Sequence, residues 1–137
     1  MAQHVSGLLV YDQSLPLELL RTALNDRSLC AGRARTCEEA RHLIEATEPQ
    51  LIFTDVNLPD GTWADVVRLG QDAASPANVI VVSGNLDMKF YIRTMESGAF
   101  DFMSPPFDAH SLDYVVRCAV SNVMTRRNER ILALAAV

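Results

Sequence analysis

The sequence has few of the residues that build metal clusters or disulfide frameworks. Its cysteines and histidines are three of each, scattered without a CxxC pair or a triad: Cys30, Cys37, Cys118, His4, His42 and His110. This spacing predicts neither a zinc site nor disulfide cross-links. Reduced thiols in a cytoplasmic protein are the expectation that follows.

Long apolar runs and excess positive charge are also missing. No apolar stretch reaches the length that spans a bilayer, and the N-terminus lacks the pattern of a signal peptide, so no membrane partner is expected. The formal net charge of −5 argues against a nucleic-acid-binding surface. A length of 137 residues with 49% hydrophobic residues fits one globular domain.

What the sequence does contain is a fivefold alternation of strand and helix patterns. Short apolar runs typical of strands occupy residues 5–11, 28–34, 51–54, 79–83 and 99–103. Helical spacing follows each run, over residues 14–25, 36–48, 62–74 and 86–97 and from 108 or 111 onward. The alternation predicts an α/β fold with five helices and a doubly wound, five-stranded parallel sheet in the flavodoxin-like order 2-1-3-4-5.

Local signals support these helices. Leucines at helical spacing predict an apolar stripe on the first helix: Leu15, Leu19, Leu20 and Leu24. Ser14 is a candidate cap for that helix, and Thr36 with Glu39 forms a capping-box pattern at the second.

Polar side chains come at the ends of three predicted strands. Asp12 follows the first strand, Asp55 the third and Ser83 the fourth. Strands 1 and 3 are neighbours in the predicted order, at the switch point where open α/β sheets bind ligands. We therefore expect these three side chains to converge at one edge of the sheet.

Over about residues 7–123 the chain resembles the receiver domain of two-component response regulators, which has the CheY-like fold. The resemblance rests on motifs in the family's order: Asp55 with Asn57, Leu58-Pro59 and Gly61, then Ser83-Gly84, then residues 98–102 followed by Pro106-Phe107. The family's turn before this proline commonly has a cis bond, so the resemblance also predicts a cis Pro105–Pro106 peptide.

The resemblance implies a non-enzymatic role in phosphorelay signalling. Asp55 would take a phosphoryl group from a sensor histidine kinase or phosphotransfer protein, and a downstream effector would read the result. Mg²⁺ would be bound by Asp12, Asp55 and the backbone carbonyl of Asn57. Ser83 would be the hydroxyl switch, and Phe102 the aromatic switch.

Each of these residues also has a purely structural interpretation. Asp55 could cap its own loop, and Asp12 could cap the first helix. Ser83 could satisfy backbone groups of its loop, and Phe102 could belong to the core. The alternative function is a pseudo-receiver that acts as a phosphorylation-independent docking or dimerisation module.

Two departures from the family pattern predict a degenerate active site. The family has two adjacent acids after strand 1, where this chain has Tyr11-Asp12, and a lysine after strand 5, where it has Pro105. Charge-assisted contacts of this kind are typically worth ~1.5–3 kcal/mol each. Tyr11 is hypothesised to fill the space of the missing acid and to hydrogen-bond Asp55. Lys89 falls on the predicted helix 86–97 and is not an evident replacement for the lysine.

Beyond the site, residues 1–125 are assigned to the receiver domain and residues 126–137 to the end of the last helix or the start of a linker. The arginine-rich residues 126–130 are interpreted as a solvated helix end, which could lead into a further domain. A homodimer through helix 4, strand 5 and helix 5 would use Asp101, Arg93 and Arg117 in pairs between subunits.

Overall fold

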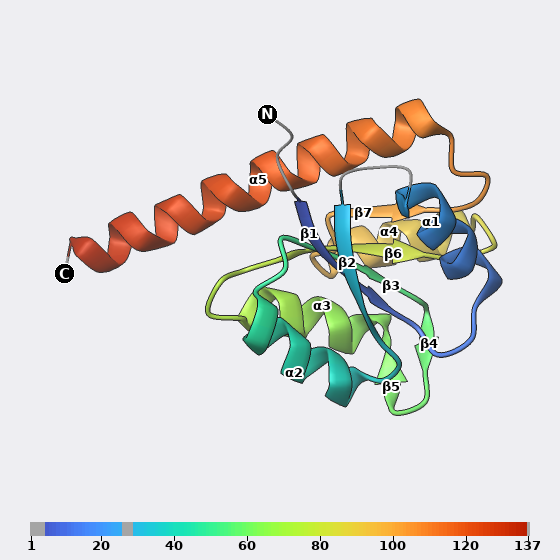
Figure 1. Cartoon of the computed structure of the whole chain (residues 1–137), viewed down its shortest axis with the longest axis horizontal. Coiled ribbons are helices and arrows are strands. Elements are labelled where there is room, and N and C mark those ends of the chain that lie inside the picture. The colour runs from blue at the N-terminus through green and yellow to red at the C-terminus, as the bar shows by residue number, and fades with distance from the viewer. Residues whose placement is uncertain (1–4, 26–28, 137) are drawn as a thin grey trace.

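Five parallel strands form the sheet at the centre of the computed structural model, which describes residues 5–25 and 29–136 (Figure 1). They are β1 (Val5–Val10), β2 (Leu29–Ala34), β3 (Leu51–Thr54), β6 (Asn78–Val82) and β7 (Asp101–Met103), in the order β2-β1-β3-β6-β7. This is the predicted order 2-1-3-4-5. Two further strands, β4 (Asn57–Leu58) and β5 (Gly61–Thr62), pair into a separate antiparallel hairpin that the sequence pattern had indicated only as a loop.

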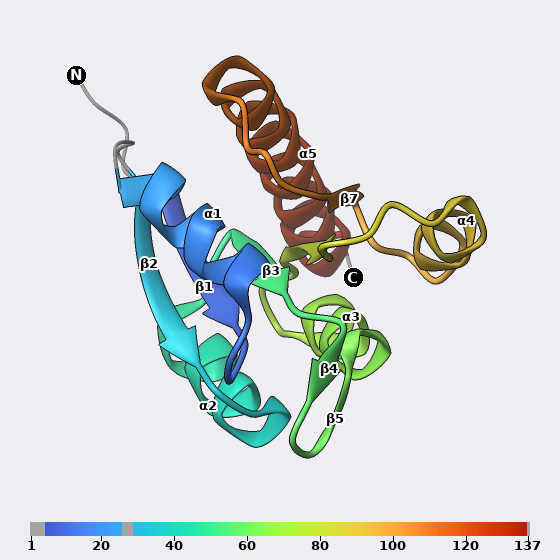
Figure 2. The same ribbon diagram turned by 90° about the vertical axis from the view of Figure 1, so that its right-hand side faces the viewer.

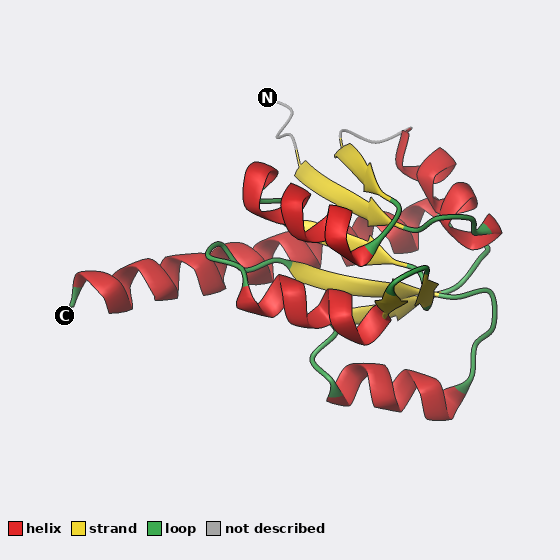
Figure 3. Cartoon of the chain, turned by 90° about the horizontal axis from the view of Figure 1, so that it is seen from below, coloured by secondary structure: helices red, strands yellow, loops and turns green. Residues whose placement is uncertain are grey.

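Five helices cover the sheet, as predicted. They are α1 (Leu15–Asn25), α2 (Cys37–Thr47), α3 (Trp63–Asp72), α4 (Met88–Glu96) and α5 (Ala109–Ala135). Helices α1 and α5 pack on one face and α2 and α3 on the other, while α4 lies beside β7 (Figures 2 and 3). Within the described residues, no helix combines the length and apolarity that crossing a membrane requires.

The core has two layers because both faces of the central strands are buried. Along β1, Leu8 and Val10 pack toward α2 and α3, whereas Leu9 and the following Tyr11 pack toward α1 and α5. Successive residues of a strand point to opposite faces, so this alternation assigns each side chain to one layer. The continuous apolar run of β3 is therefore buried on both sides.

The apolar stripe expected for α1 is partly wrong. The buried residues are Leu17, Leu20 and Leu24, whereas Leu15 and Leu19 are 71% and 46% exposed. Residues 17, 20 and 24 also recur at helical spacing, and this is the set that packs with the β1 side chains of the α1–α5 layer. Leucine spacing alone allowed either stripe.

The capping box expected at α2 forms only in half. The Thr36 hydroxyl accepts a hydrogen bond from the Glu39 N–H at 3.0 Å, as predicted. The Glu39 carboxylate, however, accepts from the N–H of Arg35 at 2.7 Å and not from that of Thr36. The Pro105–Pro106 peptide is cis, which confirms that prediction.

The interpretation of residues 126–130 as a solvated helix end is only partly right, because residues 128–130 are exposed but Arg126 and Arg127 are half-buried. Arg127 donates to the carbonyl oxygens of Pro49 and Pro76 at 2.9 Å each. Arg130 donates to the carbonyl oxygen of Ala73 at 2.8 Å, and Arg126 to the side-chain oxygen of Asn78 at 2.6 Å. The backbone carbonyls among these acceptors lie in the segments that follow α2 and α3. The arginines thereby hold α5 against the edge of the sheet at which β3 and β6 begin.

We expect Arg127→Ala to lower the free energy of unfolding by about 1–2 kcal/mol, because it leaves several partly buried carbonyl oxygens without a charged donor. Chemical denaturation measures this loss. Arg117→Ala, an exposed arginine on the same helix, serves as the control and should change stability little. Equal effects of the two substitutions would contradict the assigned role of Arg127.

Candidate functional site

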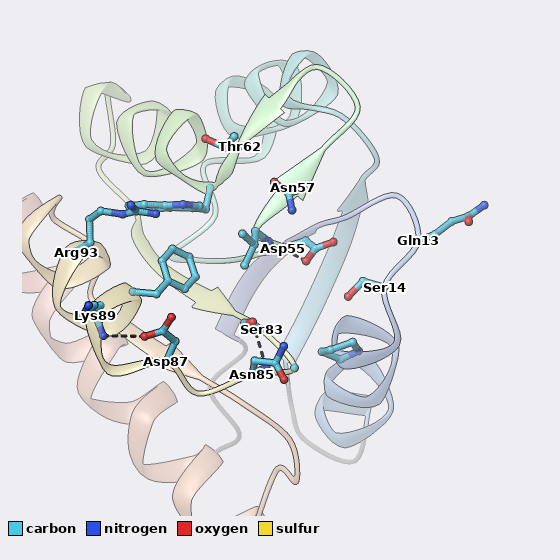
Figure 4. A pocket seen from close by; sticks show the side chains of 15 residues that line it. Gln13, Ser14, Asp55, Asn57, Thr62, Ser83, Asn85, Asp87, Lys89 and Arg93 are labelled. Carbon is cyan, nitrogen blue, oxygen red and sulfur yellow. Dashed lines mark hydrogen bonds between the residues drawn. The ribbon is translucent and has the colours of Figure 1, made fainter.

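A wide pocket of about 900 Å³ opens at the carboxyl ends of β3 and β6 (Figure 4). One side is formed by the loop after β1, by the segment after β3 and by the β4–β5 hairpin, and the other by the loop after β6 and by α4. The lining residues are Gln13, Ser14, Pro16, Asp55, Val56, Asn57, Thr62, Trp63, Ser83, Gly84, Asn85, Asp87, Lys89, Phe90 and Arg93.

Asp55 lies at the edge of this pocket because the buried strand β3 ends one residue before it. Its backbone N–H donates to the carbonyl of Val10 at 2.9 Å, which extends the pairing of β3 with β1. One carboxylate oxygen, Oδ1, accepts from the N–H of Val56 at 2.8 Å. Burial raises the pKa of the Asp55 carboxyl, and the hydrogen bond from Val56 offsets part of that rise.

Asn57 and Thr62 reach the pocket through the hairpin that follows Asp55. Asn57 is exposed and pairs with Thr62 across β4 and β5. Thr62 then caps α3, with Asp65 completing a capping box. The hairpin returns the chain to the sheet edge and starts α3 beside the pocket.

Ser83 lines the same pocket and also carries the structural role that was its alternative interpretation. Its hydroxyl accepts from the N–H of Asn85 at 3.3 Å, and its N–H donates to the carbonyl of Met103 at 3.1 Å. Its own carbonyl accepts from the hydroxyl of Ser104 at 2.7 Å. Ser83 therefore joins the loop after β6 to the loop after β7.

Asp12 is not among the residues that line the pocket; its neighbours Gln13 and Ser14 are. The Asp12 carbonyl accepts a hydrogen bond from Arg33 at 2.6 Å. Among the described residues, no three metal-binding side chains of the His, Cys, Asp or Glu type are grouped together. The role of Asp12 as a metal ligand stays a prediction.

Tyr11 does not replace the missing acid in the way hypothesised. Its ring is fully buried in the α1–α5 layer, and its hydroxyl donates to Glu18 of α1 at 2.8 Å, not to Asp55. The guanidinium of Arg33 lies 4.1 Å from the centre of the ring. Burial is the main cause that raises the pKa of the Tyr11 hydroxyl. Strand alternation explains the error, because it directs residue 11 toward α1.

Phe102 is only 7% exposed and belongs to an aromatic cluster between β7 and α4. Its ring packs edge-to-face against Phe90, with ring centres 5.5 Å apart, and against Tyr91 at 6.1 Å. Phe90 makes a second edge-to-face contact with Trp63 at 5.5 Å. Since Phe90 and Trp63 also line the pocket, this cluster connects the pocket to the core.

Sequence reasoning missed two cationic residues of the site. Lys89 and Arg93, both on α4, line the pocket together with Asp55. They are four residues apart, a spacing that places side chains on the same face of a helix. That spacing was the available signal, but nothing in the pattern indicated which face of α4 turns toward Asp55.

Asp55→Asn is expected to stabilise the folded chain at neutral pH. Because burial raises the pKa of Asp55 above its ordinary value, the wild-type chain loses stability as pH rises through the interval between those two values. This loss of stability is still present at pH 7. The Asp55→Asn variant does not have it, because an asparagine side chain does not ionise. The variant should therefore have the higher Tm at pH 7, by a margin that shrinks as the pH falls below the ordinary aspartate value.

Thermal unfolding of both proteins over a pH series tests this. Glu129→Gln, an exposed position on α5, is the control and should show no such trend. An Asp55→Asn variant that is less stable than wild type at pH 7 would count against the assignment.

Comparison with known proteins agrees with this geometry. A family model for the response regulator receiver domain matches residues 8–117. The response regulator protein PilR of Pseudomonas aeruginosa is 35% identical over 116 residues, which are 83% of this chain and 26% of PilR. KdpE of Escherichia coli, a transcriptional regulatory protein of the KDP operon, is also 35% identical over 116 residues, covering 82% of this chain and 50% of KdpE.

Among solved structures, the signal receiver domain of a putative LuxO repressor protein from Vibrio parahaemolyticus is similar, with a TM-score of 0.76 and 25% identity over 90% of this chain and 95% of that one. The chain thus spans between about a quarter and a half of the length of PilR and KdpE but nearly all of an isolated receiver domain. From the family match, the sheet order and the position of Asp55, we conclude that the chain belongs to the response regulator receiver domain family of two-component phosphorelay signalling.

Proposed function

We propose that Asp55 accepts the phosphoryl group in this receiver domain, from a sensor histidine kinase or a phosphotransfer protein. The observation that carries the proposal is a half-buried carboxylate that lies at the carboxyl end of the central strand β3 and opens onto a pocket lined by polar groups. Receiver domains of the family are generally non-enzymatic signalling domains, and response regulators interact with histidine kinases and effector domains. A cytoplasmic location fits these partners.

One hydrogen bond of Asp55 supports Oδ2 as the reacting oxygen. Oδ1 is held by the N–H of Val56, so Oδ2 is the oxygen that attacks phosphorus. A bond forms between Oδ2 and phosphorus, and the bond between phosphorus and the imidazole nitrogen of the phosphohistidine breaks. The electron pair of that bond stays on the nitrogen, which takes up a proton, and Asp55 becomes an acyl phosphate. Positioning and charge neutralisation are the main demands of such a transfer.

Receiver domains generally bind Mg²⁺ for phosphorylation, and the oxygen-rich lining of this pocket suits that ion. The raised pKa of Asp55 also fits, because a buried carboxylate without a cation is disfavoured in its ionised form. Asp55 and the carbonyl of Asn57 would hold the ion, with Asp12 as a further ligand from the loop after β1. The ion would neutralise negative charge on the carboxylate and on the phosphoryl oxygens.

The response to phosphate would start at Ser83. Its hydroxyl would turn from the N–H of Asn85 to a phosphoryl oxygen and draw the loop after β6 inward. Phe102 would act as the aromatic switch by shifting within the cluster that it shares with Phe90. The bound phosphoryl group would then bias a two-state element toward an effector.

A homodimer through α4, β7 and α5 remains part of the proposal. Of its three residues, Arg117 is exposed. Asp101 is half-buried and accepts the N–H of Phe102 at 2.8 Å, and Arg93 lines the pocket. Exposed ion pairs are individually weak, so this contact would need apolar burial as well.

Incubation with a small acyl phosphate and Mg²⁺, followed by intact-mass measurement, tests the phosphoacceptor. We expect wild type to gain the mass of one phosphoryl group and Asp55→Ala to gain none. Asp101→Asn is a matched control, because Asp101 is also a half-buried aspartate whose Oδ1 accepts the next N–H and whose pKa burial raises. It should be phosphorylated as wild type is.

Failure of wild type to gain mass under these conditions would reject Asp55 as phosphoacceptor and favour a docking or dimerisation module. Equal loss in Asp101→Asn would show that the fold, and not the reacting oxygen, had been disturbed.

A further inference from the structure

The positively charged side chains of the pocket come from α4 and not from the loop after β7, where the family pattern has its lysine. Among the described residues that line the pocket, the cations are Lys89 and Arg93, and both belong to α4. The loop after β7, where the family has its lysine, contributes no lining residue: Pro105 lies instead beside Leu19 and Ala23 at a separate apolar hollow. Among the described residues that line the pocket, the cations available to a group bound at Asp55 therefore come from α4.

Lys89 is also the only lysine among the 137 residues; the other eleven basic residues, excluding histidine, are arginines. It occupies the first turn of α4, directly after the loop that carries Ser83 and Asn85. Its backbone N–H donates to the carboxylate of the cap residue Asp87 at 2.9 Å. Within the part of the chain that the structure describes, no hydrogen bond or ion pair holds the Lys89 ammonium, so it is able to pair with a new anion.

Arg93 is less available than Lys89. Its guanidinium lies over the Phe90 ring, 5.5 Å from the ring centre, in a cation–π arrangement. Binding a phosphoryl group would require Arg93 to give up part of this contact. A lysine is a compact point charge on a flexible stem, and so it adapts to a phosphoryl group more readily.

We propose that Lys89 binds the phosphoryl group on Asp55 and so takes the place of the family's lysine, with the cation now on α4. The inference rests on the proposed function of Asp55. It involves an ion pair and no further bond making. Figure 4 shows Lys89 on the opposite side of the pocket from Asp55, so the pair forms as the pocket closes.

The packing of α4 suits such a closure. Thr94 is the only fully buried residue of this helix, whose other contacts with the core come from the half-buried Phe90 and Tyr91. An ion pair at Lys89 would pull the first turn of α4 toward the sheet edge and move Phe90 against Phe102. The charge of the phosphoryl group would thereby act on α4 directly, and not through the loop after β7.

The rate of phosphorylation by a small acyl phosphate with Mg²⁺, followed by intact mass, is the first test. Loss of one charge-assisted contact predicts that Lys89→Gln reacts about 10-fold more slowly, or holds the group for a correspondingly shorter time. Lys89→Arg should recover most of the rate because it keeps the charge. Arg68→Gln removes the same charge from an exposed site on α3 and should react as wild type does.

The single lysine allows a second test that a purely structural role would not affect. An amine-acetylating reagent reports only on Lys89 and on the terminal amine, which serves as the internal reference. In the phosphorylated chain we expect acetylation of Lys89 to slow at least several-fold, because the ion pair stabilises the protonated form, which has no lone pair to attack the reagent, while the terminal amine reacts as before.

The outcomes separate the two proposals. No phosphoryl uptake by wild type overturns the phosphoacceptor assignment and this inference with it. Uptake by wild type with an unchanged rate in Lys89→Gln and unchanged acetylation of Lys89 overturns this inference alone. An effect that appears in Arg93→Gln and not in Lys89→Gln also overturns it, since the cation would then be Arg93.

Discussion

Burial of both faces of the central strands is the constraint on which the rest of this molecule depends. Strand β3 is four residues long and fully buried, so it ends where the chain meets water again, at Asp55. The carboxylate remains half-buried at that boundary, and its pKa rises as a result. A negative group in this state is best stabilised by a cation that arrives from the pocket, which connects the packing of the sheet to the chemistry expected of the site.

The same constraint explains why Tyr11 cannot act as a substitute for an acid. Residue 11 follows Leu9 into the α1–α5 layer, where its hydroxyl meets Glu18 and its ring meets Arg33. Tyr11 therefore does not contribute a polar group to the pocket beside Asp55. Among the described residues that line the pocket, Lys89 and Arg93 of α4 are the ones with a positive charge. The family pattern would have a second acid at Tyr11 and a lysine at Pro105, and we propose that Lys89 on α4 supplies the positive charge instead.

Helix α4 and the end of α5 illustrate two opposite ways of attaching a helix. Helix α4 has one fully buried residue and an aromatic contact at Phe90, so it is joined to the sheet over a small area. The end of α5 is held by Arg127 and Arg130, whose donors meet the carbonyls that follow α2 and α3. The fold thus has a lightly attached helix next to the pocket and a firmly attached one at the far end of the sheet. A response to phosphate is expected in the former, since its displacement disrupts fewer contacts.

By itself the sequence determined the sheet order, the five helices and the placement of Asp55 and Ser83 at one edge. Those features follow from local signals, namely apolar runs, caps and turns, together with the handedness of parallel connections. It did not determine the buried face of α1, the partner of Tyr11, the contacts of Arg127 or the approach of Lys89 to the pocket. Each of these depends on the rotation of a helix about its axis, or on which face of a strand packs against an element far away in the sequence. Contacts between residues far apart in the chain are decided by packing, and only the tertiary structure contains that information.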